Sequence, residues 1–168
     1  MSAPGNINLV APFGIVASSE PSAAAARITA GGDLSMLTDS TVQGSIGDQQ
    51  TPLTYSAGGR LVSAVAGKDI YLKAISNTTL GRVQAGDTLS IETTAGGIFS
   101  YLTNTAISGK NVILTSVGDI GTSSQPLLVQ VGALGELNGT AAGAAYLFGP
   151  TLATDANARP LHLSLIHI

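Results

Sequence analysis

Apolar and polar residues alternate along much of this chain, and a glycine-containing turn precedes each alternating run. Runs of this shape read GGDLSML, GKDIYLKA, GDTLSIET and GKNVILTS. In the second run, Ile70, Leu72 and Ala74 form an apolar series, whereas Tyr71 and Lys73 occupy the positions between them. Because side chains alternate between the two faces of a strand, the pattern predicts strands with one buried face.

Corresponding apolar positions recur about every 19 residues, which is the length of one coil in a repeat protein. Three strands of about four residues and three tight turns fill such a period. Stacked coils pair in parallel and satisfy the backbone hydrogen bonds of one another. We therefore expect an all-β parallel β-helix (β-solenoid) of about seven coils. The positions taken as equivalent are Leu34, Leu53, Ile70, Leu89, Val112, Leu128 and Leu147.

One ten-residue element occurs twice. GSIGDQQTPL at 44–53 returns further along the chain as GDIGTSSQPL at 118–127, and Tyr71 and Tyr146 follow the two copies at similar distances. Glycine permits a positive φ or a close backbone approach, and proline, which has no N–H, begins a strand or closes a loop. We expect a unit of about four coils. The expected structural corners are Gly44, Gly47, Pro52, Gly118, Gly121 and Pro126.

The pattern divides the chain into three parts. Residues 1–30 hold a first rung and an irregular N-terminal segment, 31–150 hold the β-helix repeats, and 151–168 form an irregular tail. The final stretch, LHLSLIHI, lacks glycine and matches no earlier rung. Two interpretations of it stay open: a non-native extension and an amphipathic capping strand.

The composition narrows the classes of partner. The net charge is −3, and the seven basic residues are scattered, so we expect no nucleic-acid partner. The absence of cysteine excludes disulfides, thiolate metal sites and a cysteine nucleophile. No apolar run approaches the roughly 18 residues of a spanning helix, so we expect no membrane span. The N-terminus lacks the pattern of a secretory signal; an exported protein of this sequence would be an internal fragment.

The repeated element and the intervening GKDIYLKAISNTTLGRVQAGDTLSIETTAGG resemble coils of the filamentous haemagglutinin-like large exoproteins. These are Gram-negative adhesins exported by two-partner secretion, and the resemblance covers residues 31–149. It implies a right-handed parallel β-helix, export to the cell surface or medium, and a role in adhesion or in presenting a distal effector. It also implies that the outer-membrane transporter engages a region outside this fragment.

Carboxylates and histidines are the candidates for catalysis. A carbohydrate-cleaving β-helix enzyme needs clustered carboxylates on one outer face, often with calcium. Asp69 and Asp87 are separated by about one coil and are expected on adjacent coils, but both lie beside glycine, where aspartate is a common turn residue. Only His162 and His167 are available for histidine-based catalysis. We expect no catalytic residue, no cofactor and no metal site.

Two features of the expected surface are candidate modification or binding sites. Asn77 in NTT and Asn138 in NGT are sequons and therefore candidate glycan acceptors. The aromatic residues form either an exposed sugar-binding patch or separate packing contacts. These residues are Tyr71, Phe99, Tyr101 and Tyr146.

Three functions follow from this fold class. The first is a structural and adhesive shaft of a secreted surface adhesin, which contacts host-cell or extracellular ligands as a monomeric rod or with weak end-to-end association. The second is a polysaccharide lyase or hydrolase on the same scaffold. The third is a segment of a phage-type tail fibre, which would form a stable trimer.

Overall fold

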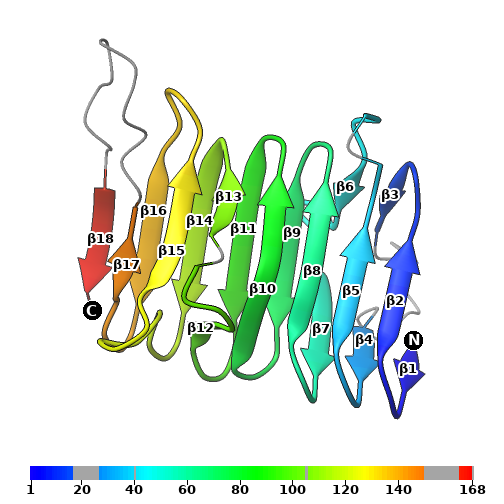
Figure 1. Cartoon of the computed structure of the whole chain (residues 1–168), viewed down its shortest axis with the longest axis horizontal. Coiled ribbons are helices and arrows are strands. Elements are labelled where there is room, and N and C mark those ends of the chain that lie inside the picture. Colours follow the sequence, from blue (N-terminus) through cyan, green and yellow to red (C-terminus); the bar gives the residue numbers. More distant parts are fainter. Residues whose placement is uncertain (17–26, 40, 105, 150–162, 168) are drawn as a thin grey trace.

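The chain folds as a β-solenoid. The computed structural model describes residues 1–16, 27–39, 41–104, 106–149 and 163–167. Among these residues the secondary structure is all strand, and every strand pairing is parallel. The strands are stacked in about six turns along one axis (Figure 1), close to the seven expected. The all-β parallel β-helix predicted from the alternation is confirmed.

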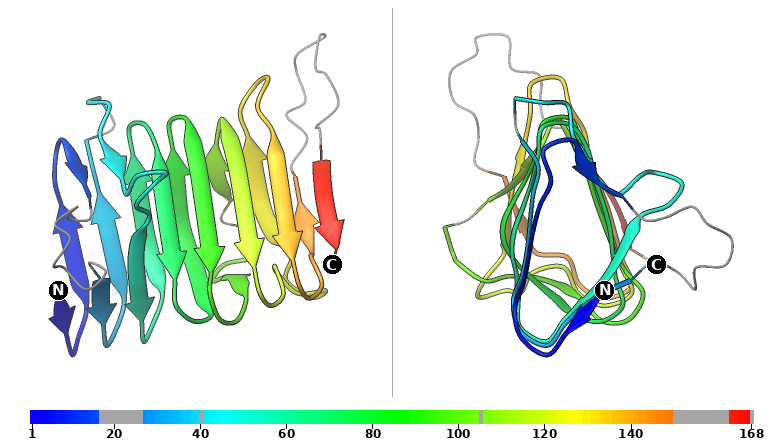
Figure 2. Two further views of the ribbon diagram at one scale, coloured as in Figure 1. Left: turned by 180° about the vertical axis from the view of Figure 1, so that it is seen from behind. Right: turned by 90° about the vertical axis from the view of Figure 1, so that its right-hand side faces the viewer.

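Two sheets enclose the core (Figure 2). We call them the ten-stranded and the eight-stranded sheet. The ten-stranded sheet contains β1 (Ser2–Ala3), β3 (Gly14–Ile15), β4 (Arg27–Ala30), β6 (Ser45–Ile46), β7 (Leu53–Ala57), β9 (Ile70–Ala74), β11 (Thr88–Thr93), β14 (Asn111–Ser116), β16 (Leu137–Ala141) and β18 (Leu163–His167). The eight-stranded sheet contains β2 (Ile7–Val10), β5 (Leu34–Leu37), β8 (Leu61–Ala66), β10 (Thr78–Ala85), β12 (Ile98–Ser100), β13 (Ile107–Gly109), β15 (Leu127–Val131) and β17 (Leu147–Phe148).

The central coils contain two long strands each, which corrects the expectation of three short strands per coil. β8 and β10 lie in the eight-stranded sheet, and β9 and β11 lie in the ten-stranded sheet. β10 is eight residues long and crosses its whole face without a corner. Gly81 lies inside β10, so this glycine does not end the strand. In these central coils the sharp corners therefore lie between the strands, where the chain passes from one sheet to the other.

The core consists of ladders of inward side chains that repeat from coil to coil. In β9 the buried residues are Ile70, Leu72 and Ala74, as the alternation predicted, and Tyr71 and Lys73 are partly exposed. Each fully buried leucine or isoleucine contributes about 1.5–3 kcal/mol of stability relative to exposure. The neighbouring coils cover these side chains, so a coil on its own would lose this stabilisation. One ladder, at most 2% exposed, runs Ile46, Ile70, Leu89, Val112 and Leu137.

The predicted coil length is correct only in the centre of the solenoid. Ile70 pairs with Leu89 and Leu89 pairs with Val112, so these three positions are equivalent, as expected. Leu34 and Leu53, however, lie in different sheets, because the alternation is the same on both. Coil length also varies, since the step from Gly14 to its partner Ser45 is much longer than the step from Ile70 to Leu89.

The two ends of the chain lie at opposite ends of the stack (Figure 1). β1 and β2 form part of the first coil, and β18 pairs in parallel with β16 at the other end. Leu163–His167 form β18, a strand inside the segment 151–168 that was expected to be irregular. The two interpretations of the final stretch, a non-native extension and an amphipathic capping strand, stay predictions. Residues 17–26 and 150–162, including His162, lie outside the described residues.

Candidate functional site

The two copies of the repeated element build the same local backbone. Gly47 and Gly121 have φ of +74° and +68°. Each donates its N–H to the preceding coil, Gly47 to the carbonyl of Ile15 at 2.7 Å and Gly121 to that of Ile98 at 2.8 Å. Pro52 immediately precedes β7, and Pro126 likewise precedes β15. Gly44 and Gly118 are closely approached by the backbone of the preceding coil, at Phe13 and Gly96 respectively.

The two copies lie on opposite sheets. Ile46 and Leu53 flank the first loop in the ten-stranded sheet, whereas Leu127 follows the second loop in the eight-stranded sheet. Three coils separate Ile46 from Val112 on one sheet, and the second copy begins at Gly118, shortly after β14 ends. The unit that separates the copies therefore spans between three and four coils, where about four were expected. The ten-residue element fits either sheet because strands in both sheets alternate inward and outward side chains in the same way.

A row of Asn and Asp side chains holds successive coils together at the edges of the sheets. In each case Oδ1 accepts a hydrogen bond from a backbone N–H of the following coil, at 2.7 to 3.3 Å. These bonds continue the ladder where the strands end, so the corner backbone stays satisfied. We call these residues the Asx corners: Asn6, Asp33, Asp69, Asn77, Asn111 and Asp119.

Glycine in the next coil makes room for these side chains. A Cβ at Gly32 would overlap Oδ1 of Asn6, and a Cβ at Gly59 would overlap Oδ1 of Asp33. The same holds for Gly96 against Asn77 and for Gly143 against Asp119. The glycine and Asx residues that recur before the alternating runs are thus partners across adjacent coils, a relation that spacing alone did not reveal.

Asp69 and Asp87 lie on adjacent coils, as expected, and serve the corner structure. Oδ1 of Asp69 accepts from the N–H of Thr88 at 3.1 Å, and its Oδ2 lies 3.5 Å from Nζ of Lys68. Asp87 donates its N–H to the carbonyl of Lys68 at 2.8 Å. Oδ1 of Asp87 is buried and has no hydrogen-bond partner among the described residues. The turn interpretation accounts for Asp69, and Asp87 keeps one unpaired oxygen.

The two sequons lie in different environments. Asn77 is exposed, but its Oδ1 accepts the N–H of Gly97 at 2.7 Å as an Asx corner. Asn138 is exposed in the middle of β16, where it pairs in register with Ile113 and Ser164. Glycosylation at either residue stays a prediction.

The aromatic residues named as a sugar patch do not share one face. Tyr71 belongs to the ten-stranded sheet and Phe99 to the eight-stranded sheet. The ring of Tyr101 lies under the guanidinium of Arg60, with 3.9 Å from Cζ to the ring centroid, and Arg60 pairs with Asp33 at 3.1 Å. Hydrogen bonds from Arg60 lower the pKa of Asp33 below its ordinary value.

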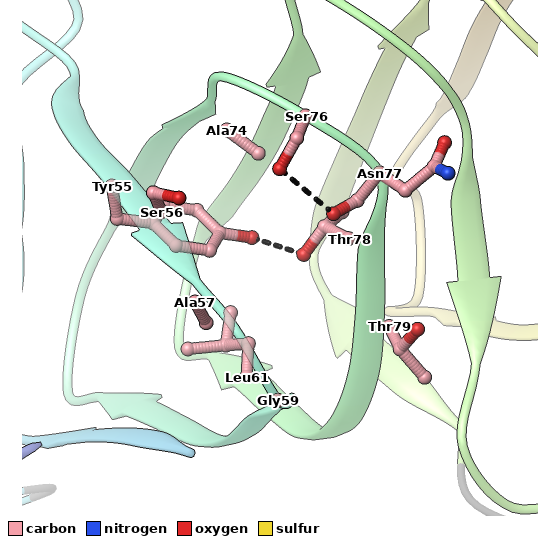
Figure 3. A pocket seen from close by; sticks show the side chains of 10 residues that line it. All are labelled: Tyr55, Ser56, Ala57, Gly59, Leu61, Ala74, Ser76, Asn77, Thr78 and Thr79. Atoms are coloured by element: carbon pink, nitrogen blue, oxygen red, sulfur yellow. Dashed lines mark hydrogen bonds between the residues drawn. The ribbon is translucent and has the colours of Figure 1, made fainter. Parts of the chain in front are cut away.

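The interior contains one tyrosine (Figure 3). Tyr55 is 1% exposed in β7, and its hydroxyl forms a hydrogen bond with the hydroxyl of Thr78, which is 3% exposed in β10. This bond joins the two sheets across the core and satisfies both buried hydroxyls. Burial raises the pKa of Tyr55 well above its ordinary value, and the Thr78 bond offsets part of that rise.

Comparisons with protein family models, with curated proteins and with solved structures find no match for this chain. In the described part of the chain no group of three or more His, Asp or Glu residues is placed to hold a metal ion. The described residues also include no helix long and apolar enough to cross a membrane.

Proposed function

We propose that this chain is a shaft segment of a secreted bacterial surface adhesin, which holds binding surfaces away from the cell. The observation that carries the proposal is the parallel stack from β1 to β18 in the ten-stranded sheet. Eight strands lie on that path, and seven steps of about 4.8 Å give a shaft of about 34 Å. The function of a shaft is geometric: it extends along one axis and presents long sheet faces.

The outer row of the ten-stranded sheet supports contact with a polar surface. Thr54, Lys73, Glu92, Thr115 and Thr140 follow one another in register on successive coils. Nζ of Lys73 and Oε1 of Glu92 form an ion pair at 2.8 Å. Side chains of this kind form many weak contacts, and their affinity grows with the number engaged together. We expect the partners to be host-cell or extracellular surface ligands.

Export to the cell surface or medium is proposed from the resemblance of residues 31–149 to the filamentous haemagglutinin-like exoproteins. Gly47 and Gly121 support it, because two distant copies of the motif adopt one backbone conformation. An outer-membrane transporter would act on a region outside this fragment.

Adhesion tests the proposal directly. Beads coated with the purified chain should bind epithelial cells or extracellular matrix, and light scattering should show a monomer or weak self-association rather than a trimer. A stable trimer would favour the tail-fibre alternative. Beads that bind no better than beads coated with albumin would contradict the adhesive role.

Polysaccharide cleavage is the second candidate, because Asp69 and Asp87 lie on adjacent coils and one Asp87 oxygen is unpaired among the described residues. Incubation with a polysaccharide panel, with and without calcium, distinguishes it from the shaft. Turnover that is lost in Asp87→Ala, while the variant keeps its fold, would replace the shaft proposal by an enzyme.

A further inference from the structure

An open depression lies on the outer side of the eight-stranded sheet. Its volume is about 530 Å³, and it is open to solvent rather than enclosed. The described residues that line it carry no charge: Thr103, Asn104, Ala106, Pro126, Leu128 and Phe148. They come from the loop after β12, the second copy of the repeated element, and β15 and β17. We call it the flank depression.

The floor of the flank depression is an apolar row along the solenoid axis. Leu128 pairs in register with Phe148 on the next coil. Ala106 directly precedes Ile107, which pairs with Val129, so Ala106 is the register neighbour of Leu128 on the preceding coil. The alternation of β15 points Leu128 outward, and Phe148 is 55% exposed. Ala106, Leu128 and Phe148, on three successive coils, therefore form an apolar strip that ends in the exposed ring of Phe148.

Hydrogen bonds hold the segments that lie next to the depression. Nε2 of Gln125 donates to the carbonyl of Ser100 at 3.0 Å, which ties the second repeated element to the end of β12. Thr122 and Gln125 bond each other through their backbones at 3.0 and 3.2 Å, which closes the loop into a tight turn. Oγ of Ser100 donates to the carbonyl of Leu102 at 2.6 Å.

From this geometry we infer that the flank depression binds a neutral saccharide. A pyranose has one face of C–H groups, which suits Leu128 and the electron-rich face of Phe148. Its hydroxyl edge suits the carboxamide of Asn104 and the hydroxyl of Thr103, which are among the lining residues. The uncharged lining offers nothing to sulfate or carboxylate groups, and a wholly apolar ligand would leave the rim groups unpaired. The role of this site in adhesion rests on the proposed function.

A glycan array tests the inference. The chain is multimerised on a fluorescent carrier and applied to neutral hexose and N-acetylhexosamine glycans beside sialylated and sulfated ones. We expect binding to neutral glycans. Phe148→Ala and Asn104→Ala should each weaken it by about tenfold, since each removes one side of the contact. Tyr146→Ala is the matched control, because Tyr146 is 40% exposed and does not line the depression.

Three results would overturn the saccharide site: binding to no glycan, binding to anionic glycans only, or unchanged binding by Phe148→Ala. Thermal unfolding of each variant should match the parent, since the replaced side chains are exposed. The adhesion assay separates this site from the shaft. Beads that adhere to cells while the array stays blank would remove the site and leave the shaft proposal standing.

Discussion

Gly47 and Gly121, which belong to opposite sheets, occupy one and the same backbone environment. Both have positive φ, and a Cβ at either would overlap the carbonyl oxygen of a tyrosine in the next coil, Tyr71 for the first and Tyr146 for the second. The N–H of the residue after each proline, Leu53 or Leu127, lies against the same position. Each glycine therefore satisfies a torsional and a steric requirement together.

Gly47→Ala and Gly121→Ala should each destabilise the chain by at least about 2 kcal/mol. The positive φ costs an L-residue about 1–2 kcal/mol, and the overlap with the tyrosine carbonyl adds to it. Urea unfolding measures the loss. Gly5→Ala is the control, because a Cβ there meets nothing within 4 Å, and its stability should stay within about 0.5 kcal/mol of the parent. Equal stability of all three variants would contradict the assigned geometry.

Asn77→Ala should lower the free energy of unfolding by about 1–3 kcal/mol, because the N–H of Gly97 loses its acceptor at a partly buried corner. Asn77→Asp keeps an oxygen in place and should retain most of the stability. Asn138→Ala, on the exposed face of β16, is the control. If Asn77→Ala and Asn138→Ala unfold at the same urea concentration, the Asx corners do not stabilise the stack.

The hydroxyl pair in the core should be cooperative. Tyr55→Phe leaves the buried Thr78 hydroxyl without its partner, which costs about 1–3 kcal/mol, and Thr78→Val does the same to Tyr55. The double variant removes both polar groups and should cost less than the two single changes together. A double-mutant cycle of unfolding free energies measures the coupling, and additive single effects would exclude the bond.

Alkaline pH should destabilise the chain through Tyr55. Burial raises the pKa of Tyr55 above the ordinary value of 10, so above pH 10 the folded chain holds a proton that the unfolded chain releases. The folded state then binds more protons, and stability falls as pH rises. Unfolding followed from about pH 8 to about pH 11 should show a steeper loss for the parent than for Tyr55→Phe. Identical slopes would contradict the burial of this phenol.

The local alternation of apolar and polar residues was sufficient to predict the strands, the inward ladders and the solenoid class. The side-chain period of two is a property of each strand alone, so Ile70 and Leu72 could be assigned to the core before any pairing was known. The equivalence of Gly47 and Gly121 was likewise visible, because a backbone that requires glycine and proline imposes both at fixed positions.

Sheet membership, coil length and the surface sites depend on contacts between coils. The same alternation fits either sheet, so the length of the intervening loops determines that Leu53 joins one sheet and Leu127 the other. The partnership of Asn77 with Gly97 and the row that ends in Phe148 exist only once coils are stacked in register. Residues about one coil apart in the sequence meet there because neighbouring coils bring their backbones together. The spacing of residues along the sequence does not specify which residues of the next coil they will contact.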